Sequence, residues 1–294
     1  MTPINLILNG IAFGSIYAAV ALALVLIWRS TRIVNFAQGG MLMVTTFIAY
    51  TLVQEHGQNY WVGLVVALLA GLVIGAVVER VLVRPVEGAS PLNAVILTLG
   101  LLLLLQGGAG MIWGNGVASY PPAFSTIFYR VGHQELLFSP NYLFVVVSVA
   151  VVVVLLYLLF QRTSIGLRMR ASAFSPEVAR LLGVRVGRML TLGWALAAAV
   201  GALAGVLIAG TAPNYMNPNG FDALLIYGFT AAVIGGLDSP IGAVVGGLLM
   251  GIAFAFLNNY VSVQIDTFYA LVLLTVVLMV RPSGLFSRTA TRRV

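Results

Sequence analysis

Residues 162–188, RTSIGLRMRASAFSPEVARLLGVRVGR, contain six of the fifteen arginines of this chain and one acid, Glu177. Long apolar sequence lies on both sides of this stretch. Arginine and lysine keep a short loop between apolar membrane segments on the cytoplasmic side of the bilayer. The stretch therefore predicts a membrane protein with a basic cytoplasmic loop over residues 161–188.

A short helix is predicted inside this loop. Ser175 can cap its N-terminus, Pro176 suits the first helical position, and Glu177 favours the positive end of the helix dipole. Gly183 is placed to end the helix in a left-handed conformation.

One face of this predicted helix is apolar. Val178, Leu181 and Leu182 are spaced i, i+3 and i+4, so they share a face. Such a face can dock into a cytosolic partner. A basic loop lying on anionic lipid headgroups explains the same pattern, and the spacing alone leaves both interpretations open.

The composition is that of an integral membrane protein in a lipid bilayer. Of the 294 residues, 61% are hydrophobic and 8% are charged, whereas soluble domains carry about 25% charged residues. The chain has no cysteine, which excludes disulfides, and His56 and His133 fall in separate loops, so no metal site is predicted. The net charge of +7 does not indicate nucleic acid, because the arginines lie between apolar spans.

The apolar segments predict an all-α, polytopic helical bundle that forms one transmembrane domain over residues 1–294. A span needs about 20 apolar residues, or fewer inside a bundle. The two segments that flank Asp238-Ser239-Pro240 are short, so they form either two spans or a hairpin that does not fully cross. The count is therefore eight to nine, at 4–27, 37–53, 61–78, 92–113, 141–160, 189–210, 222–236, 241–257 and 267–280.

The arginines also predict the orientation. An outside N-terminus and a cytoplasmic C-terminus place fourteen of the fifteen arginines on the cytoplasmic side and leave Arg130 outside. Residues 1–9 carry no Lys or Arg, so the first segment is expected to be retained rather than cleaved as a signal peptide. One cytoplasmic turn carries four charged residues that are expected to pair with one another: Glu79, Arg80, Arg84 and Glu87.

Four polar residues at membrane depth are candidates for a substrate path. Asn35 and Gln38 lie where the second apolar segment begins, either in a loop with Asn35 as a helix cap or in a broken helix that lines the path. Ser15 and Tyr17 lie in the first segment, where each either satisfies a neighbouring backbone group or lines the path.

Small residues recur at the spacing that lets membrane helices pack closely. Gly10, Gly14 and Ala18 form one face of the first segment. Three later GxxxG pairs are at 201/205, 242/246 and 247/251. Asp238 lies in the turn at 237–240 and is predicted to cap the following helix, with a contact to a cytoplasmic partner as the alternative.

Several kinds of chemistry are missing from the sequence. No charged residue falls in the middle of a predicted span, which disfavours transport coupled to an ion or proton. The chain has no GxxxxGK[ST], no HExxH and no plausible catalytic set, so it is predicted not to be an enzyme. Energy for transport would then have to come from another protein.

Four stretches resemble the LivH-type permease family of branched-chain amino acid ABC transporters: NGIAFGSIYA (9–18), VNFAQG (34–39), ASAFSPEVARLLGV (171–184) and GGLDSPIG (235–242). In that family, the basic loop contacts the ATPase subunit. Two positions depart from the family pattern, because Phe174 and Gly40 stand where polar or acidic residues are usual.

The resemblance implies that nine residues of the loop couple this chain to an ATPase: Ala173, Phe174, Ser175, Pro176, Glu177, Arg180, Leu181, Leu182 and Gly183. It also implies a place in the bacterial inner membrane and a complex with a second LivM-type permease, two LivG/LivF-type ATP-binding subunits and an external solute-binding protein. ATP and magnesium would be held by those ATP-binding subunits, and this chain would bind no cofactor.

The cargo stays open between branched-chain or related amino acids and small neutral solutes such as urea or short amides. Two functions of other classes also remain, an ion-coupled secondary transporter and a membrane scaffold that transports nothing.

Overall fold

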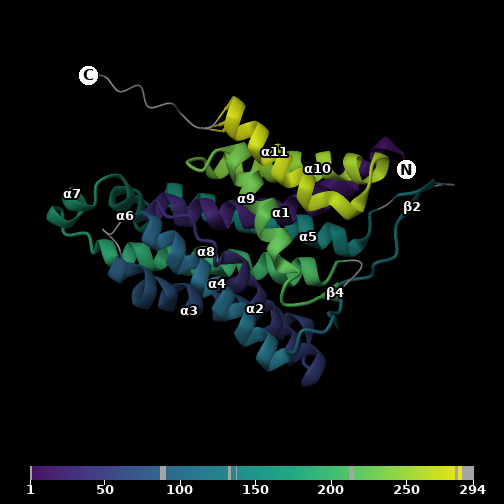
Figure 1. Cartoon of the computed structure of the whole chain (residues 1–294), viewed down its shortest axis with the longest axis horizontal. Coiled ribbons are helices and arrows are strands. Elements are labelled where there is room, and N and C mark those ends of the chain that lie inside the picture. The colour runs from purple at the N-terminus through teal and green to yellow at the C-terminus, as the bar shows by residue number, and fades with distance from the viewer. Residues whose placement is uncertain are drawn as a thin grey trace.

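The computed structural model describes residues 2–86, 91–131, 134–136, 138–211, 215–281 and 284–286. Within these ranges the chain forms an elongated bundle of eleven α-helices (Figure 1). Some predictions lie outside the described residues, namely those on Glu87, His133, Arg288, Arg292 and Arg293.

In chain order the helices are α1 (Pro3–Thr31), α2 (Gln38–Tyr50), α3 (Tyr60–Val77), α4 (Pro91–Trp113), α5 (Pro140–Arg162), α6 (Ser164–Phe174), α7 (Pro176–Leu181), α8 (Val186–Ala209), α9 (Phe221–Gly235), α10 (Pro240–Tyr260) and α11 (Asp266–Val280). Wide π-helical turns extend α2 (η1, Thr51–Glu55) and α3 (η2, Val78–Val83), and tighter turns lie at Arg84–Val86 (η3) and Val263–Ile265 (η4). Short antiparallel strands pair β1 (Ala118–Ser119) with β4 (Tyr215–Met216) and β2 (Arg130–Val131) with β3 (Gln134–Glu135).

Each of the nine predicted apolar segments is helical, which confirms the all-α polytopic fold class. Six helices of the described chain are long and apolar enough to cross a membrane. The helix α10 is among them, so the second half of the predicted short hairpin is long enough for a full span. The helices α9 and α11 have 15 residues each and rise about 22 Å, less than the roughly 30 Å of a bilayer core.

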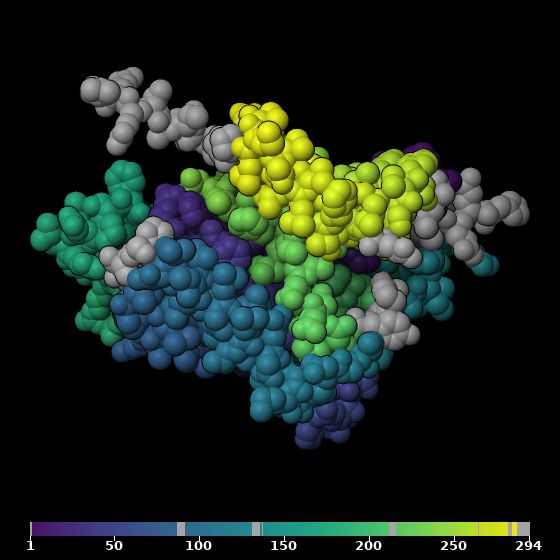
Figure 2. Space-filling view, in the orientation of Figure 1, coloured from purple at the N-terminus to yellow at the C-terminus, as the bar shows by residue number. Residues whose placement is uncertain are grey.

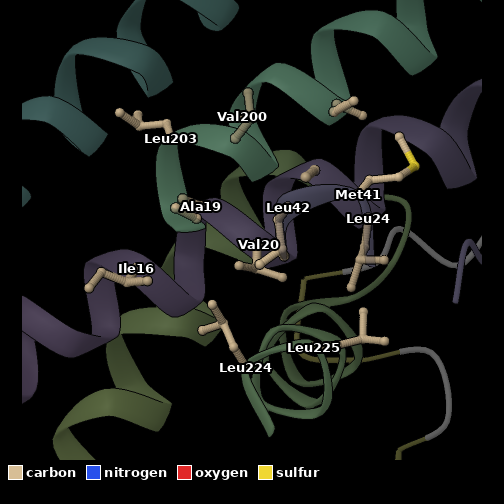
Figure 3. Close-up of a cluster of buried hydrophobic side chains, with 14 of the residues drawn as sticks. Ile16, Ala19, Val20, Leu24, Met41, Leu42, Val200, Leu203, Leu224 and Leu225 are labelled. Atoms are coloured by element: carbon tan, nitrogen blue, oxygen red, sulfur yellow. The ribbon is translucent and has the colours of Figure 1, made fainter. Parts of the chain in front are cut away.

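The first helix lies at the centre of the bundle. In its apolar window 89% of the residues are buried, against 11% in α4, which mostly faces outward. Figure 3 shows Val20 and Leu24 of α1 among apolar side chains from α2, α8 and α9, including Leu42, Val200 and Leu225. The outer helices expose apolar side chains because their solvent is lipid.

The predicted small-residue faces form the contact between α1 and α10. A Cβ added to Gly247 would lie 2.4 Å from the Cα of Ala18, and one added to Gly10 would lie 2.6 Å from the Cα of Ile252. The two backbones therefore touch. Close approach of this kind supplies van der Waals packing where lipid leaves no hydrophobic drive between helices.

The other two GxxxG pairs also lie at helix contacts. Gly246 of α10 packs on the carbonyl of Ala231 in α9, at 2.3 Å from an added Cβ. Gly201 and Gly205 of α8 receive the side chains of Gln38 and Thr46 from α2. The prediction that these glycines serve helix packing is confirmed.

The arginine-rich segments gather at one end of the bundle. Arg32, after α1, pairs with Asp238 in the turn before α10, and Arg84 donates to the carbonyl of Gly187 at the start of α8. Figures 1 and 2 show α6 and α7 forming that end, while α1 begins at the other. At the far end β1 pairs with β4, and Asn141 donates to the carbonyl of Gly210.

Adding one methyl group at the α1–α10 contact should destabilise the bundle. We expect Gly247→Ala to lower the stability of the detergent-purified protein by about 1–3 kcal/mol, since backbone must move to admit the Cβ. The matched control is Gly100→Ala in α4, where an added Cβ meets nothing within 4 Å. Thermal melting measures both, and equal melting temperatures for the two variants would contradict this packing.

Candidate functional site

A short helical excursion, α6 followed by α7, leaves the bundle between α5 and α8. Thr163 starts it by accepting a hydrogen bond from the amide of Gly166, at 3.1 Å. The chain then folds back tightly on α5, since a Cβ at Gly166 would lie 2.2 Å from the carbonyl oxygen of Leu159. This reversal directs α7 away from the bundle (Figure 1).

The ends of α7 lie where the sequence predicts them. Pro176 occupies the first turn with Glu177, and Ser175 is the N-cap residue, although its side chain makes no capping hydrogen bond. Gly183 has φ +78° and ends the helix as predicted. Its amide donates to the carbonyl of Arg180 at 3.0 Å, and that of Val184 donates to Ala179 at 2.9 Å, the paired bonds of a Schellman cap.

The predicted apolar face of α7 is exposed. Leu181 is 88% exposed and Leu182 77%, and Phe174 at the end of α6 is 94% exposed. Only the small Ala179 turns inward, where it packs with Val186 and Leu190 of α8. Of the other predicted coupling residues, Pro176, Glu177, Arg180 and Gly183 are exposed, while Ala173 and Ser175 are half-buried. Exposed apolar groups gathered in this way mark an interaction surface.

A polar network anchors the helix that follows α7. The fully buried Glu79 receives hydrogen bonds from Arg84 at 2.9 Å and from Thr191 at 2.7 Å. Arg84 also donates to the carbonyl of Gly187 at 2.7 Å. The predicted pairing of Glu79 with Arg84 is confirmed. The part played by Thr191 was missed, because nothing in the local sequence brings it near.

A second polar contact joins α1 to the α9–α10 turn. Asp238 pairs with Arg32 and accepts a hydrogen bond from the indole of Trp28 at 3.3 Å. The prediction that Asp238 caps α10 is wrong, because Ser239 accepts the amide of Gly242 at 3.0 Å instead. A cationic partner far away in the sequence has drawn the carboxylate of Asp238 away from the helix end.

The break between α1 and α2 buries two amide side chains. The side-chain oxygen of Asn35 accepts the amide of Ala37 at 3.0 Å, and its nitrogen donates to Gln38 at 3.3 Å. Gln38 donates in turn to the carbonyl of Ala197 in α8, at 3.2 Å. The interpretation of Asn35 as the cap of α2 is wrong, because the cap residue is Ala37. Asn35 stabilises the turn before the helix, and Gln38 fastens it to α8.

An apolar cavity of about 220 Å³ lies beside this break. Its walls come from α1, the break, α9 and α11, and Asn35 is the only polar residue among them. The others are Leu24, Val34, Phe36, Leu225, Ile226, Phe229, Leu271 and Leu274. The cavity can therefore take an apolar group of small volume.

Ser15 and Tyr17 lie apart from this cavity. The hydroxyl of Ser15 donates to the carbonyl of Ile11 at 2.7 Å, within its own helix. The buried ring of Tyr17 contacts Tyr227 edge-on, with the ring centres 5.3 Å apart, and also Phe254 at 6.2 Å. The structure thus brings Asn35 and Gln38 together and leaves the other two candidates in packing contacts.

The sequence alone did not predict two acid–amide pairs. Gln106 donates to Asp222 at 2.6 Å, and Asn258 donates to Asp266 at 3.2 Å. Each acid lies in the first turn of a short helix, α9 or α11, where a carboxylate favours the helix dipole. In the sequence, each acid stands at the start of a short apolar segment, and this pattern could have indicated the two pairs.

Taken together, these features define a class of protein. The described residues form a bundle of membrane helices with no cluster that could hold a metal ion, and the arginine-rich end displays an exposed apolar helix. This is the architecture of a polytopic membrane protein with an exposed apolar surface at one end.

The family model described as "Branched-chain amino acid transport system / permease component" matches residues 6–280, and the chain belongs to this family. It is therefore a non-enzymatic, multi-pass ABC importer permease of the bacterial inner membrane.

Relatives of known name match most of the chain. The high-affinity branched-chain amino acid transport system permease protein LivH of Escherichia coli (strain K12) is 31% identical over 97% of this chain and 96% of its own length. BraD of Pseudomonas aeruginosa, of the same description, is 30% identical over 98% and 97%. The galactose/methyl galactoside import permease protein MglC of Haemophilus influenzae is 29% identical over 68% and 60%.

Among solved structures, PsaBC from Streptococcus pneumoniae in complex with Fab has a similar fold. Its TM-score is 0.51 at 14% identity, over 95% of this chain and 91% of the PsaBC chain.

Removing the positive charge of Arg84 from the network around the buried Glu79 should destabilise the first turns of α8. We expect Arg84→Met to cost about 3 kcal/mol, because it leaves the carboxylate of Glu79 buried without a charge partner. The double variant Glu79→Gln with Arg84→Met should recover part of that loss, since no buried charge remains. Thermal melting of the purified protein checks both, and a double variant less stable than Arg84→Met would contradict this account.

Proposed function

We propose that this chain imports leucine-like, branched-chain amino acids as one of two related permease subunits, driven by cytoplasmic ATP-binding subunits that dock on α7. The exposed apolar face of Phe174, Leu181 and Leu182 carries the proposal. Bare apolar side chains of that size at the end of a membrane protein are costly in water. A cytoplasmic protein that covers them removes that cost.

The orientation follows from the charges. The arginine-rich stretches share one end of the bundle with α7, and arginine-rich loops stay in the cytoplasm. The N-terminus is then outside. The far end, where β1 pairs with β4, faces an external solute-binding protein.

In this proposal, a movement of α7 is transmitted to α8. The Schellman cap at Gly183 reverses the chain after α7, and the packing of Ala179 against Val186 and Leu190 holds α7 against the start of α8. Closure of two LivG/LivF-type ATPases around ATP and magnesium would push on α7, and α8 would move with it. The break between α1 and α2 would move with α8, because the side chain of Gln38 donates a hydrogen bond to the carbonyl of Ala197 in α8.

The cavity beside the break supports a cargo with a branched aliphatic side chain. Apart from Asn35 the residues in its walls are apolar, which suits such a side chain better than urea or a short amide, since those need several hydrogen-bonding partners. The ammonium and carboxylate of the amino acid would lie outside this cavity. In this proposal the cargo passes between this chain and a LivM-type permease. The chain itself binds no cofactor, and residues 1–294 act as one permease domain.

Polar substitution of the α7 face should uncouple transport without unfolding the protein. We expect Leu181→Ser with Leu182→Ser to reduce ATPase co-purification and leucine uptake at least tenfold, with an unchanged melting temperature. Leu167→Ser on α6 is the matched control, because Leu167 is also exposed, at 61%. Normal uptake in the double variant would refute docking on α7.

Filling the cavity should alter substrate selection. In proteoliposomes that hold the whole transporter, we expect Leu274→Trp to lower kcat/KM for leucine at least tenfold. Leu278→Trp, one turn further along α11 and 45% exposed, should have no such effect.

The same proteoliposomes separate the alternatives by their driving force and cargo. ATP-dependent leucine uptake supports the proposal. Uptake driven by an ion gradient without ATP would favour a secondary transporter, transport of urea alone would favour the amide class, and no uptake of any solute would favour a scaffold.

A further inference from the structure

A lipid-facing groove of about 290 Å³ runs between α1, α5 and α10. Leu22 and Leu26 of α1 form its floor, and the walls include Leu156 of α5 and Val244 of α10. The lining is apolar along this length. A groove of this size is too small for a further helix, whose diameter with side chains is about 10 Å.

The mouth of the groove lies at the arginine-rich end. Arg29 in the last turn of α1, Gln161 at the end of α5 and Pro240 at the start of α10 all line it. Two helices thus end, and a third begins, at the same point. The groove runs from this mouth into the apolar interior of the membrane.

Positive charge outweighs negative charge at this mouth. Arg29 makes no hydrogen bond or ion pair with any residue that the structure describes. Asp238 attracts its charge, whereas Arg170 and Arg32 both repel it. The nearby acid, Asp238, is paired with Arg32. Arg170 donates to Gln161 at 3.3 Å, but its buried Nε has no partner.

A smaller cavity of about 30 Å³ continues the groove toward the coupling segment. Leu26, Arg29 and Phe160 line both spaces, and the smaller one is also lined by Ser30 of α1 and by Met169, Arg170 and Ala173 of α6. Ala173 directly precedes the exposed Phe174. A molecule at the mouth would therefore touch the helix that carries α7.

We propose that the groove binds an anionic phospholipid of the cytoplasmic leaflet, with one acyl chain along the floor formed by Leu22 and Leu26 and its phosphate between Arg29 and Arg170. Guanidinium groups bind phosphate oxygens through paired hydrogen bonds, and basic pockets between membrane helices on the cytoplasmic side suit anionic headgroups. The proposal rests on the proposed orientation of the chain. A partner protein helix fits less well, because its cytoplasmic flank would itself be basic.

The bound phosphate would also place the coupling segment. It cancels the repulsion between Arg29 on α1 and Arg170 on α6, so it holds α6 against α1. The position from which α7 projects then depends on the lipid.

Lipid binding can be measured without ATP or substrate, so its outcome is independent of the transport proposal. The full-length protein, purified with its partner subunits in a neutral detergent, is titrated with phosphatidylglycerol or with phosphatidylcholine of the same acyl chains. Native mass spectrometry and thermal melting are the readouts. We expect phosphatidylglycerol to be retained and to raise the melting temperature, and phosphatidylcholine to do neither.

Arg29→Gln with Arg170→Gln should weaken phosphatidylglycerol binding at least tenfold. Arg168→Gln is the matched control, since Arg168 lies on the same helix, is exposed, and lines neither cavity. A groove-filling variant, Ile241→Trp, keeps both arginines and should also weaken binding, because Ile241 lines the groove and is 66% exposed. Its control is Leu249→Trp, on the same helix and 48% exposed.

Several results would overturn the proposal. Equal retention of the two lipids would show that charge is not recognised, and unchanged binding in Ile241→Trp would show that no acyl chain lies in the groove. Stabilisation by inorganic phosphate equal to that by phosphatidylglycerol would indicate an anion site without lipid. A photo-crosslinker at Val154, which lines the groove, that joins a protein subunit instead of lipid would assign the groove to that subunit.

Discussion

The contact between the backbones of α1 and α10 is the constraint on which the rest of the bundle depends. Lipid is as apolar as the helix surfaces, so helices in a membrane gain little from hiding apolar side chains from it. Gly10, Gly14, Gly247 and Gly251 remove the side chains that would keep the two helices apart. With α1 held in this way, α5, α8 and α9 pack around it and bury almost its whole length.

Polar contacts at the arginine-rich end also hold the helices of the bundle together. The buried pair of Glu79 and Arg84 ties the extension of α3 to the first turns of α8, and the pair of Arg32 and Asp238 ties α1 to α10. In the proposed mechanism, α8 would therefore move together with the extension of α3 when α7 is displaced. The small cavity at Arg29 is lined by Arg170 and Ala173 of α6, so the proposed lipid would also contact the coupling segment.

The break between α1 and α2 shapes the cavity proposed for the cargo. Asn35 and Gln38 keep the irregular backbone of the break satisfied at membrane depth, which an apolar surrounding requires. Their polar groups are hydrogen-bonded to one another and to the backbone, and apart from Asn35 the residues that line the neighbouring cavity are apolar. The same residues thus shape the proposed cargo site and join it to α8, the helix that follows the coupling segment.

The amino-acid sequence by itself determined the membrane setting, the helical segments and both ends of α7. These features are local, since they depend on apolar length, on arginine placement and on one glycine able to take φ +78°. Only the tertiary structure decided which polar groups meet. Gln38 bonds to a carbonyl 159 residues away, and Arg32 pairs with an acid 206 residues away, so no spacing within one segment could reveal them. The tertiary structure likewise separated Ser15 and Tyr17 from the cavity, because helix packing determines which side of α1 faces each neighbour.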